Sequence, residues 1–408
     1  MLLNFRITNF RSINETVELS MVPSDFKNKK NIFKIINHNA TKNKDNYALT
    51  SSAIYGANAS GKSNVIKALF EFVSFITFSS DNKPNDVIKM FIPFKLNSDN
   101  LKRPSRFSID FVLKNVFYSY EISVFENKII DEVLFYQPKG KDVKIFSRKE
   151  QEIIRGNGFE GVFELIKQRT NENQLFLGKL ALENVQFAKE IYEFIRTIFV
   201  FTTEIFHSNE FNKTFNSKVL GSLNKDIAVF NLSKSLVNKI DTQVIDYFHD
   251  GEKIKTFHLN NKNENIEFEF DEESSGTQRI ISFIPLLLFA IKYGLIVVVD
   301  EFERSLHPDI AQYILSLFND DEVNKKGAQF IFATHDTTLL SPENKLRRDQ
   351  INLVEKNVKG ETELYSLTDI KGIREGNYEK WYLEGRLGGV PNIARETFRH
   401  ELIEFINS

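Results

Sequence analysis

The sequence contains no cysteine, and it has only one tryptophan and three methionines among its 408 residues. A chain without cysteine has no disulfide scaffold, no thiolate zinc site and no cysteine nucleophile. It also lacks an excess of charge of either sign, because 53 Lys and Arg stand against 55 Asp and Glu. This balance argues against a generally basic nucleic-acid-binding surface, although a local basic patch remains compatible with it. The length predicts two or three domain-sized units.

The distribution of apolar residues also shows no segment typical of a targeting signal or a membrane span. Residues 1–7 alternate between apolar and polar positions, which is unlike the continuous apolar stretch of a signal peptide. The most apolar region, residues 280–299, is long enough to cross a bilayer, but it contains Pro285 and Lys292 and runs directly into Asp300. We expect a buried helix followed by a buried strand there. We also expect a soluble, cytoplasmic protein without a membrane partner.

Hydrophobic periodicity predicts strands in the first part of the chain. Residues 3–7 and 17–21 alternate as a half-buried hairpin does, and residues 107–148 alternate as an antiparallel sheet does. The Lys- and Asn-rich residues 27–46 favour a mobile surface loop.

Residues from about 150 to 255 have a more helical character. Apolar residues within 188–198 follow a 3-4-3 spacing, and those within 232–248 repeat every fourth residue, which predicts amphipathic helices. These stretches are too short and too interrupted for a long coiled-coil arm. A second hairpin pattern follows at residues 257–270, and a helix is expected from about Thr277.

Two continuous apolar runs, residues 295–299 and 330–333, are typical of parallel strands that are covered on both faces. A further strand is predicted at residues 52–55. It is followed by a glycine-rich turn and then by a helical pattern.

This turn, residues 56–63, matches the phosphate-binding pattern G-x-x-x-x-G-K-[ST] without a mismatch. Its glycines let backbone N–H groups point at a β-phosphate, and the following helix presents its positive N-terminus to the same group. Lys62 is expected to reach the β- and γ-phosphate oxygens of ATP, and the Ser63 hydroxyl to ligate Mg²⁺. The predicted cofactors are therefore ATP and Mg²⁺. The candidate ATP-binding residues are Gly56, Asn58, Ser60, Gly61, Lys62, Ser63 and Asn64.

Asp300 and Glu301 directly follow the apolar run at residues 295–299. Parallel strands deliver the residues at their carboxyl ends into the crevice where ligands bind. We expect Asp300 to hold Mg²⁺ through its water shell and Glu301 to orient or deprotonate the attacking water, with Lys62 as a further catalytic group. The alternative is a pair of acids that simply ends a strand in solvent.

The order of the remaining motifs resembles the ATP-binding-cassette (ABC) superfamily, in its SMC/RecF/OLD-like branch. Residues 274–278, Ser-Ser-Gly-Thr-Gln, are similar to the L-S-G-G-Q signature, with Ser274 in place of Leu and Thr277 in place of the second Gly. The resemblance implies that Ser275 and Gly276 face the γ-phosphate of an ATP bound to a second subunit.

Other segments carry the same resemblance. His335 resembles the catalytic switch histidine that contacts the γ-phosphate, although a histidine that only caps the preceding strand is the alternative. Residues 303–308 resemble the D-loop, which crosses the dimer interface. Residues 9–12, Asn-Phe-Arg-Ser, resemble the element in which an arginine, here Arg11, approaches the nucleotide or DNA; a solvated turn is the alternative. No glutamine stands in a Q-loop context near residues 92–95, which argues against coupling to a membrane transporter.

Residues 300–308 and the glycine-rich residues 385–391 resemble a narrower group, the AAA-type ATP-binding proteins related to the ATPase half of OLD nucleases. Such proteins recur in bacterial anti-phage and abortive-infection operons, for example those of PARIS and Septu. OLD nucleases carry a C-terminal Toprim domain with a D-x-D cluster, but fewer than eighty residues follow Asp336 and they contain no D-x-D. Any nucleolytic effector is therefore expected to act in trans.

The resemblance implies an α/β fold: an ABC-type P-loop ATPase head with an antiparallel β subdomain and an inserted helical subdomain. Residues 1–150 are expected to form an N-terminal lobe with the P-loop and the antiparallel sheet, and residues 151–255 the helical insertion. Residues 256–408 would form a C-terminal lobe with the signature, the acid pair, the D-loop and the switch histidine.

The implied function is an ATP-hydrolysing switch that forms a homodimer or higher oligomer around ATP and hydrolyses slowly as a monomer. The resemblance implies a sensor ATPase of an anti-phage system, which controls an effector, nuclease or toxin encoded nearby. The alternatives are a RecF/SMC-like DNA-binding ATPase of DNA repair and a nucleotide-gated scaffold. Short basic clusters at residues 27–30 and at Arg347 and Arg348 are the charge support for DNA as a partner.

Overall fold

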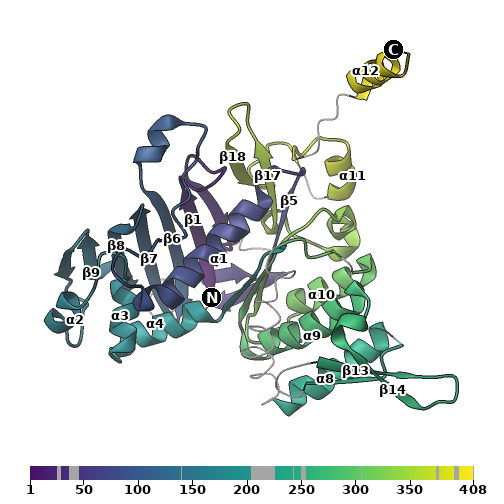
Figure 1. The fold of residues 1–408 in the computed structure, drawn as a ribbon, viewed down its shortest axis with the longest axis horizontal. Helices are drawn as coiled ribbons and strands as arrows, with labels where there is room; N and C mark the ends of the chain where they lie inside the picture. Colours follow the sequence, from purple (N-terminus) through teal and green to yellow (C-terminus); the bar gives the residue numbers. More distant parts are fainter. Residues whose placement is uncertain are drawn as a thin grey trace.

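The computed structural model describes residues 1–24, 29–35, 46–138, 140–203, 226–241, 243–249, 254–304, 306–373, 376–389 and 395–407. Two large sheets dominate the molecule, and helix α1 (Lys62–Phe78) packs between them (Figure 1). One hydrophobic core joins the antiparallel sheet, α1 and one face of the parallel sheet. A second core covers the opposite face of the parallel sheet.

Within the described residues, seven strands form the antiparallel sheet, in the order β10-β9-β8-β7-β6-β1-β2. The predicted N-terminal hairpin is confirmed, because β1 pairs with β2 and places Phe5 opposite Leu19. The antiparallel sheet predicted for residues 107–148 is confirmed as strands β6 to β9. The strands of this sheet are β1 (Leu2–Thr8), β2 (Val17–Ser20), β6 (Ser105–Leu113), β7 (Val116–Phe125), β8 (Lys128–Gln137), β9 (Val143–Lys149) and β10 (Glu152–Arg155).

The second sheet has the strand order β11-β15-β16-β5-β17-β18, and its strands are parallel except for β18 at the edge. The parallel strands predicted at residues 52–55, 295–299 and 330–333 are confirmed. The carboxyl ends of β5, β16 and β15 lie side by side, at the edge where sheets of this kind bind ligands. The strands are β5 (Ser51–Gly56), β11 (Ile198–Phe201), β15 (Ile296–Val299), β16 (Gln329–Ala333), β17 (Ile351–Lys356) and β18 (Thr362–Ser366).

Successive residues of each parallel strand face the two different cores, which is why these strands read as continuous apolar runs. In β5, Ile54 belongs to the core around α1, whereas Ala53 and Tyr55 belong to the opposite core. In β15, Val298 and Val299 divide in the same way. Burial on both faces holds the sheet rigid beneath the loops that leave its carboxyl edge.

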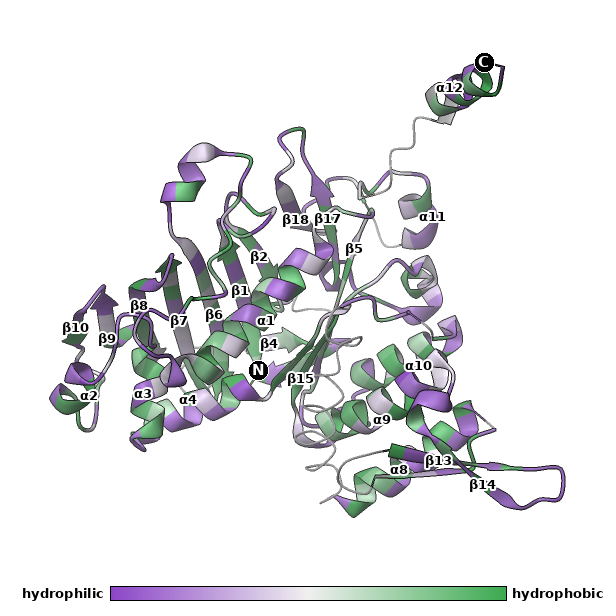
Figure 2. Cartoon of the chain, in the orientation of Figure 1, coloured by the Kyte–Doolittle hydropathy of each residue, from purple (hydrophilic) through white to green (hydrophobic). Residues whose placement is uncertain are grey.

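Helices α9 and α10 pack into the core on the second face of the parallel sheet (Figure 1). Figure 2 shows the mainly hydrophobic residues of α9 beside those of β15, so the predicted buried helix followed by a buried strand is confirmed. No helix among the described residues is both long and apolar enough to span a bilayer. The remaining α-helices are α2 (Glu164–Gln168), α3 (Phe176–Leu182), α4 (Gln186–Arg196), α8 (Ile227–Ile240), α9 (Ser275–Tyr293), α10 (Pro308–Asn319), α11 (Tyr378–Leu383) and α12 (Arg395–Asn407). Short 3-10 helices are η1 (Ser79–Asp81), η2 (Ser98–Lys102), η4 (Phe270–Glu272), η5 (Thr337–Leu340), η6 (Pro342–Asn344) and η7 (Arg348–Gln350).

Two helices predicted from spacing are shorter than expected. Helix α4 ends at Arg196, and Ile198 instead begins strand β11 of the parallel sheet. Helix α8 ends at Ile240, and Phe248 lies in strand β12 (Asp246–His249). A buried strand that follows a buried helix prolongs the apolar pattern, so spacing alone does not mark the boundary between them. The hairpin predicted at residues 257–270 is confirmed as β13 (Ile254–Leu259) and β14 (Asn265–Glu269), to which β12 adds a third strand.

The expectation of a loop over residues 27–46 is wrong at residues 32–35 and at residue 46, which lie in strands, whereas residues 29–31 lie outside any strand or helix. Strand β3 (Ile32–Ile35) pairs with β4 (Asn46–Leu49), and Ile32 and Ile35 are both buried. Two apolar side chains among lysines and asparagines are therefore enough to anchor a short strand here. The rest of that expectation concerns residues 27–28 and 36–45, which lie outside the described residues.

Candidate functional site

Two glycines of the loop between β5 and α1 have no room for a side chain, and one of them, Gly61, also has a left-handed backbone. Gly61 precedes the helix with φ 116°, in the left-handed region, and a side chain there would collide with Thr362. A side chain at Gly56 would collide with the Val354 carbonyl. The strand–turn–helix context that the P-loop pattern requires is therefore present.

The Lys62 side chain folds back over this loop. Its Nζ donates to the carbonyl oxygens of Gly56, at 2.7 Å, and Ala57, at 3.1 Å, and the residue is only 6% exposed. Burial lowers the pKa of Lys62 to about 8, while the nearby carboxylates of Asp300, Glu303 and Glu301 oppose that shift. The ammonium group of Lys62 is therefore hydrogen-bonded to neutral carbonyl groups, which a phosphate oxygen can replace.

Asp300 lies at the end of β15 and is 1% exposed. The Ser63 hydroxyl donates a hydrogen bond to its carboxylate, which joins the two residues predicted to bind Mg²⁺. Burial raises the pKa of Asp300, and its Oδ1 is buried with no hydrogen-bond partner among the described residues. A buried carboxylate oxygen without a donor costs free energy, and a hydroxyl beside a carboxylate is the ligand set that Mg²⁺ accepts. The residues present thus fit this metal ion.

Glu301 follows with φ 51°, a left-handed conformation that is uncommon for a residue with a side chain. Its carboxylate pairs with Arg304, with Oε2 3.0 Å from Nη1, and its carbonyl accepts a hydrogen bond of 2.7 Å from Arg279. Burial lowers the pKa of Arg279 to about 10, and the carboxylates nearby partly restore it. The left-handed backbone conformation of Glu301 sets the direction in which its side chain points from the loop after β15.

His335 follows β16, the strand between β5 and β15. The His335 backbone N–H donates to Glu303 Oε1 at 2.6 Å, and Glu303 Oε2 is buried without a hydrogen-bond partner in the part of the chain that the structure describes. Burial, and then the charge of Lys62, lower the pKa of His335, so the imidazole is neutral at pH 7. The structure therefore brings Lys62, Asp300, Glu301 and His335 to one edge of the sheet. Residue 305 of the predicted D-loop lies outside the described residues.

The N-terminal element at residues 9–12 lies against the P-loop. Ser12 Oγ accepts a hydrogen bond of 2.6 Å from Asn64, and it lies 2.7 Å from the Thr362 hydroxyl. Thr362 in turn donates to the carbonyl of Ser60 at 3.0 Å. Arg11 has φ 51°, and its guanidinium lies 5.6 Å from the centre of the Phe10 ring. Thr362 was not predicted, because only the folded sheet brings β18 to this loop.

The signature-like residues open helix α9. Ser274 caps the helix by accepting the Thr277 N–H at 3.1 Å, and the Thr277 hydroxyl donates to Asp241 at 2.7 Å. The two positions that depart from L-S-G-G-Q thus have local structural roles. Ser275 is exposed and Gly276 is partly exposed in the first turn, on a different element from the P-loop.

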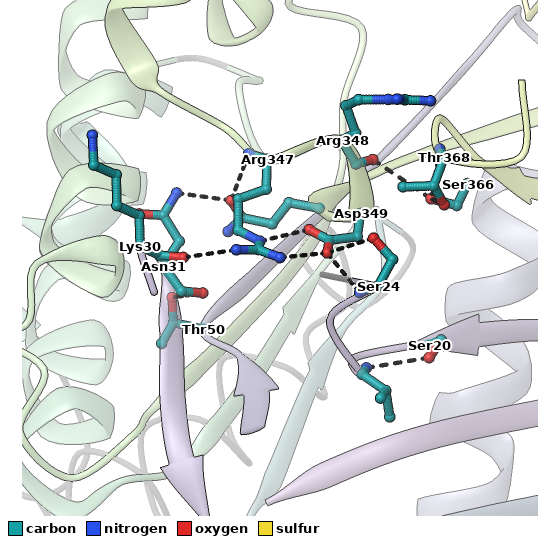
Figure 3. A network of polar contacts seen from close by, with 12 residues as sticks. Ser20, Ser24, Lys30, Asn31, Thr50, Arg347, Arg348, Asp349, Ser366 and Thr368 are labelled. Carbon is teal, nitrogen blue, oxygen red and sulfur yellow. Dashed lines mark hydrogen bonds and ion pairs between the residues drawn. The ribbon is translucent and has the colours of Figure 1, made fainter. Parts of the chain in front are cut away.

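Two arginines that were expected to belong to a basic cluster are used internally. Arg347 is buried and makes a two-pronged ion pair with Asp349, at 2.7 and 2.8 Å, and Ser24 donates to the same carboxylate (Figure 3). Arg348 donates to the carbonyl of Leu367 at 3.1 Å. The expectation of a basic surface cluster at these positions is therefore wrong, because a charge-only pattern does not reveal burial. The other cluster is described only at residues 29–30.

A glycine-rich loop between a parallel strand and a helix, with an acid pair at the end of a nearby strand, defines a P-loop ATPase. The predicted α/β fold, with a P-loop in a mainly parallel sheet and an antiparallel β subdomain, is confirmed. Residues 51–341 match the family described as "AAA domain, putative AbiEii toxin, Type IV TA system", and the chain belongs to that family.

No curated protein matches the sequence. Among solved structures, an SMC head bound to the C-terminal winged-helix domain of ScpA has 13% identity and a TM-score of 0.47, over 90% of this chain and 97% of that one. The SMC head domain from Thermotoga maritima has 15% identity and a TM-score of 0.35, over 90% and 98%. The Smc head domain with an extended coiled coil, bound to the C-terminal domain of ScpA from Pyrococcus furiosus, has 12% identity and a TM-score of 0.40, over 90% and 96%.

Proposed function

We propose that this protein is an ATP-hydrolysing switch that closes as a head-to-tail dimer around ATP and Mg²⁺. One observation carries the proposal: the Ser63 hydroxyl and the buried, incompletely bonded carboxylate of Asp300 meet beside Lys62. A carboxylate is rarely kept buried at the end of a strand without its full set of partners unless a cation completes them. An ATPase with these groups needs little further chemistry, since phosphoryl transfer depends mainly on positioning and charge stabilisation.

Each residue of the site has one task in this mechanism. Lys62 would leave the Gly56 carbonyl and bind β- and γ-phosphate oxygens. Ser63 and Asp300 would hold Mg²⁺, which would supply positive charge beside the phosphates. Glu301 leaves Arg304 and orients the attacking water, accepting its proton. The neutral His335 donates a hydrogen bond to the γ-phosphate. Arg11 lies on the element that contacts Asn64 and so approaches the nucleotide from the N-terminal side.

The second half of each site comes from the other subunit. Ser275 and Gly276 lie in the first turn of α9, a helix of 19 residues whose backbone N–H groups and dipole favour an anion at that end. The γ-phosphate of ATP bound by one copy would join this turn of the other copy, so that hydrolysis frees the interface. Residues 151–255, the region named earlier as an insertion, are the proposed contact for a partner protein.

In the cell, we propose a sensor ATPase of an anti-phage defence system that controls an effector acting in trans. The family description, which refers to a putative toxin of a toxin–antitoxin system, supports a role in arresting growth or infection. In this proposal the acid pair, the histidine and the P-loop all serve ATP. A nuclease or toxin partner would supply the damaging chemistry.

The dimer can be tested with Glu301→Gln, which removes the carboxylate that takes the proton and retains a group of the same size. With saturating ATP and Mg²⁺, light scattering after gel filtration should show a dimer for this variant, whereas turnover falls by about 10²–10³-fold. The double variant Glu301→Gln with Ser275→Arg is the matched control and should remain a monomer. A Glu301→Gln protein that binds ATP but stays monomeric would contradict the head-to-tail dimer.

A further inference from the structure

The glycine-rich tail that follows α11 has no assigned role, and it lies outside the residues that match the family. Gly385, Gly388 and Gly389 all have positive φ, between 68° and 75°, so this tail follows a path that other residues would strain to adopt. Leu387 in its middle is 1% exposed. A buried, conformationally demanding segment implies a fixed place on the body of the protein.

The tail packs against Gly56, the first glycine of the P-loop. The Gly56 N–H donates a hydrogen bond to the hydroxyl of Tyr382, and the same hydroxyl donates to the Gly389 carbonyl at 3.0 Å. The Tyr382 and Tyr55 rings lie 5.6 Å apart, and a Cβ built on Gly389 would lie 3.5 Å from the Gly56 Cα. Burial raises the pKa of Tyr382, which keeps the phenol protonated and able to donate.

The backbone N–H and carbonyl groups of Gly56 thus each contact a side chain, and the proposed ATP site assigns these two side chains different roles. Its carbonyl accepts a hydrogen bond of 2.7 Å from Lys62, which must leave to reach a phosphate. Its N–H stays on Tyr382, which is 6% exposed. Tyr382 is therefore the fixed end of the loop while Lys62 moves.

Helix α11 also touches the segment that follows the switch histidine. Glu379 accepts a hydrogen bond of 3.5 Å from the Thr337 hydroxyl, and Tyr55 donates to the Asp336 carbonyl at 3.1 Å. The loops that follow β5 and β16 consequently both contact helix α11, which precedes α12 in the chain.

We propose that Tyr382 is a positioning residue that locks the first glycine of the P-loop to the C-terminal tail, so that ATP binding and tail order stabilise each other. This inference rests on the proposed ATP site. Linkage requires the effect to be reciprocal: if the tail strengthens ATP binding, ATP must strengthen the tail by the same factor.

The test compares Tyr382→Phe with Tyr365→Phe. Tyr365 donates to the Leu387 carbonyl at 3.2 Å and so holds the same tail through one hydroxyl, but it does not contact Gly56. Phenylalanine at position 382 keeps the ring packing and leaves the Gly56 N–H without its acceptor. We expect the Kd for a fluorescent ATP analogue with Mg²⁺ to rise about tenfold in Tyr382→Phe and less than about twofold in Tyr365→Phe.

A second measurement separates positioning from general stability. In the wild type, the ATP analogue should slow hydrogen exchange of backbone amides between residues 382 and 389, and this protection should be lost in Tyr382→Phe. A purely structural tyrosine would lower the melting temperature and leave the Kd and the protection unchanged, which overturns the inference. A wild-type protein that does not bind the analogue at all would overturn the ATP site itself, so the two failures are distinguishable.

Discussion

Two buried polar clusters in this molecule differ in how completely their hydrogen bonds are made. In the antiparallel sheet, Glu132 and Arg148 are both fully buried, and Glu132 accepts hydrogen bonds from Tyr120 and from the N–H groups of Phe176 and Leu177. Arg148 donates to backbone carbonyls at each end of its guanidinium, including that of Gln174 at 2.6 Å.

At the carboxyl edge of the parallel sheet, the polar groups are buried but incompletely bonded. Asp300 Oδ1, Ser60 Oγ and Glu303 Oε2 have no hydrogen-bond partner among the residues described. Both clusters cost free energy to bury, and burial raises the pKa of Glu132 as it raises that of Asp300. The difference is that the chain itself supplies Glu132 with a buried cation and three hydrogen-bond donors. The fully bonded Glu132 therefore indicates a structural role, whereas the incompletely bonded Asp300, at the carboxyl end of a parallel strand beside the P-loop, supports a ligand site.

The largest expected effect breaks the satisfied cluster. Glu132→Ala leaves Arg148 buried without its carboxylate, which should lower the free energy of unfolding by about 3–5 kcal/mol. Urea unfolding measures this loss, and Glu18→Ala is the control, because the exposed Arg6–Glu18 pair should contribute less than about 1 kcal/mol. The ATP affinity of folded Glu132→Ala protein should be unchanged. A large loss of ATP affinity would contradict the purely structural role assigned to the Glu132 cluster.

The next effect is on binding rather than on folding. Lys62→Ala removes the cation that compensates the phosphates, and we expect ATP affinity to fall by at least about 100-fold, near 3 kcal/mol. Its melting temperature should not fall below that of the wild type, because Lys62 is a buried cation that rests on neutral carbonyls. Calorimetry with ATP and Mg²⁺ provides the affinity, and retained micromolar binding would reject the P-loop assignment.

A smaller effect should have opposite signs at two aspartates. Asp300→Asn removes a buried charge whose hydrogen bonds are incomplete, so the nucleotide-free protein should become more stable, by about 1 kcal/mol, while Mg²⁺-dependent ATP binding weakens. At Asp349, burial would raise the pKa of the carboxylate, but the hydrogen bond and charge of Arg347 outweigh burial and hold it below its usual value. Asp349→Asn should therefore destabilise the protein. Thermal melts without nucleotide test the pair, and equal signs would contradict the comparison.

The last effect concerns pH. The pKa of Lys62 is about 8 without nucleotide, below its usual value, so Lys62 is protonated at pH 7 and loses its proton as the pH rises through 8. Because phosphate binding requires the cation, ATP affinity should fall by up to about tenfold per pH unit above that point. Titrations between pH 7 and 9.5 measure the slope, and Lys62→Arg, which keeps its charge, should show no such fall. An affinity that is constant over this range in the wild type would count against Lys62 as the phosphate ligand.

The sequence was sufficient for the parts of the site that depend on local chain order. The P-loop, the acid pair and the strands that position them follow from short patterns, because each motif spans a few residues within one strand–turn unit. The contacts of Thr362 and Tyr382 with the loop were not predictable, since they join residues about 300 positions apart through the folded sheet. The burial of Arg347 was missed for the same reason, and the ends of α4 and α8 were missed because a buried helix and a buried strand share one apolar pattern.

The hydrogen bond from the His335 backbone to the Glu303 carboxylate ties together the chains that leave two neighbouring strands. These segments cannot be displaced separately without breaking this hydrogen bond of 2.6 Å. If a neighbouring molecule displaces Glu303, the backbone of His335 is therefore displaced as well. We expect a small molecule that binds between these segments to inhibit the protein without occupying the nucleotide pocket. Such an inhibitor would not have to compete with cellular ATP.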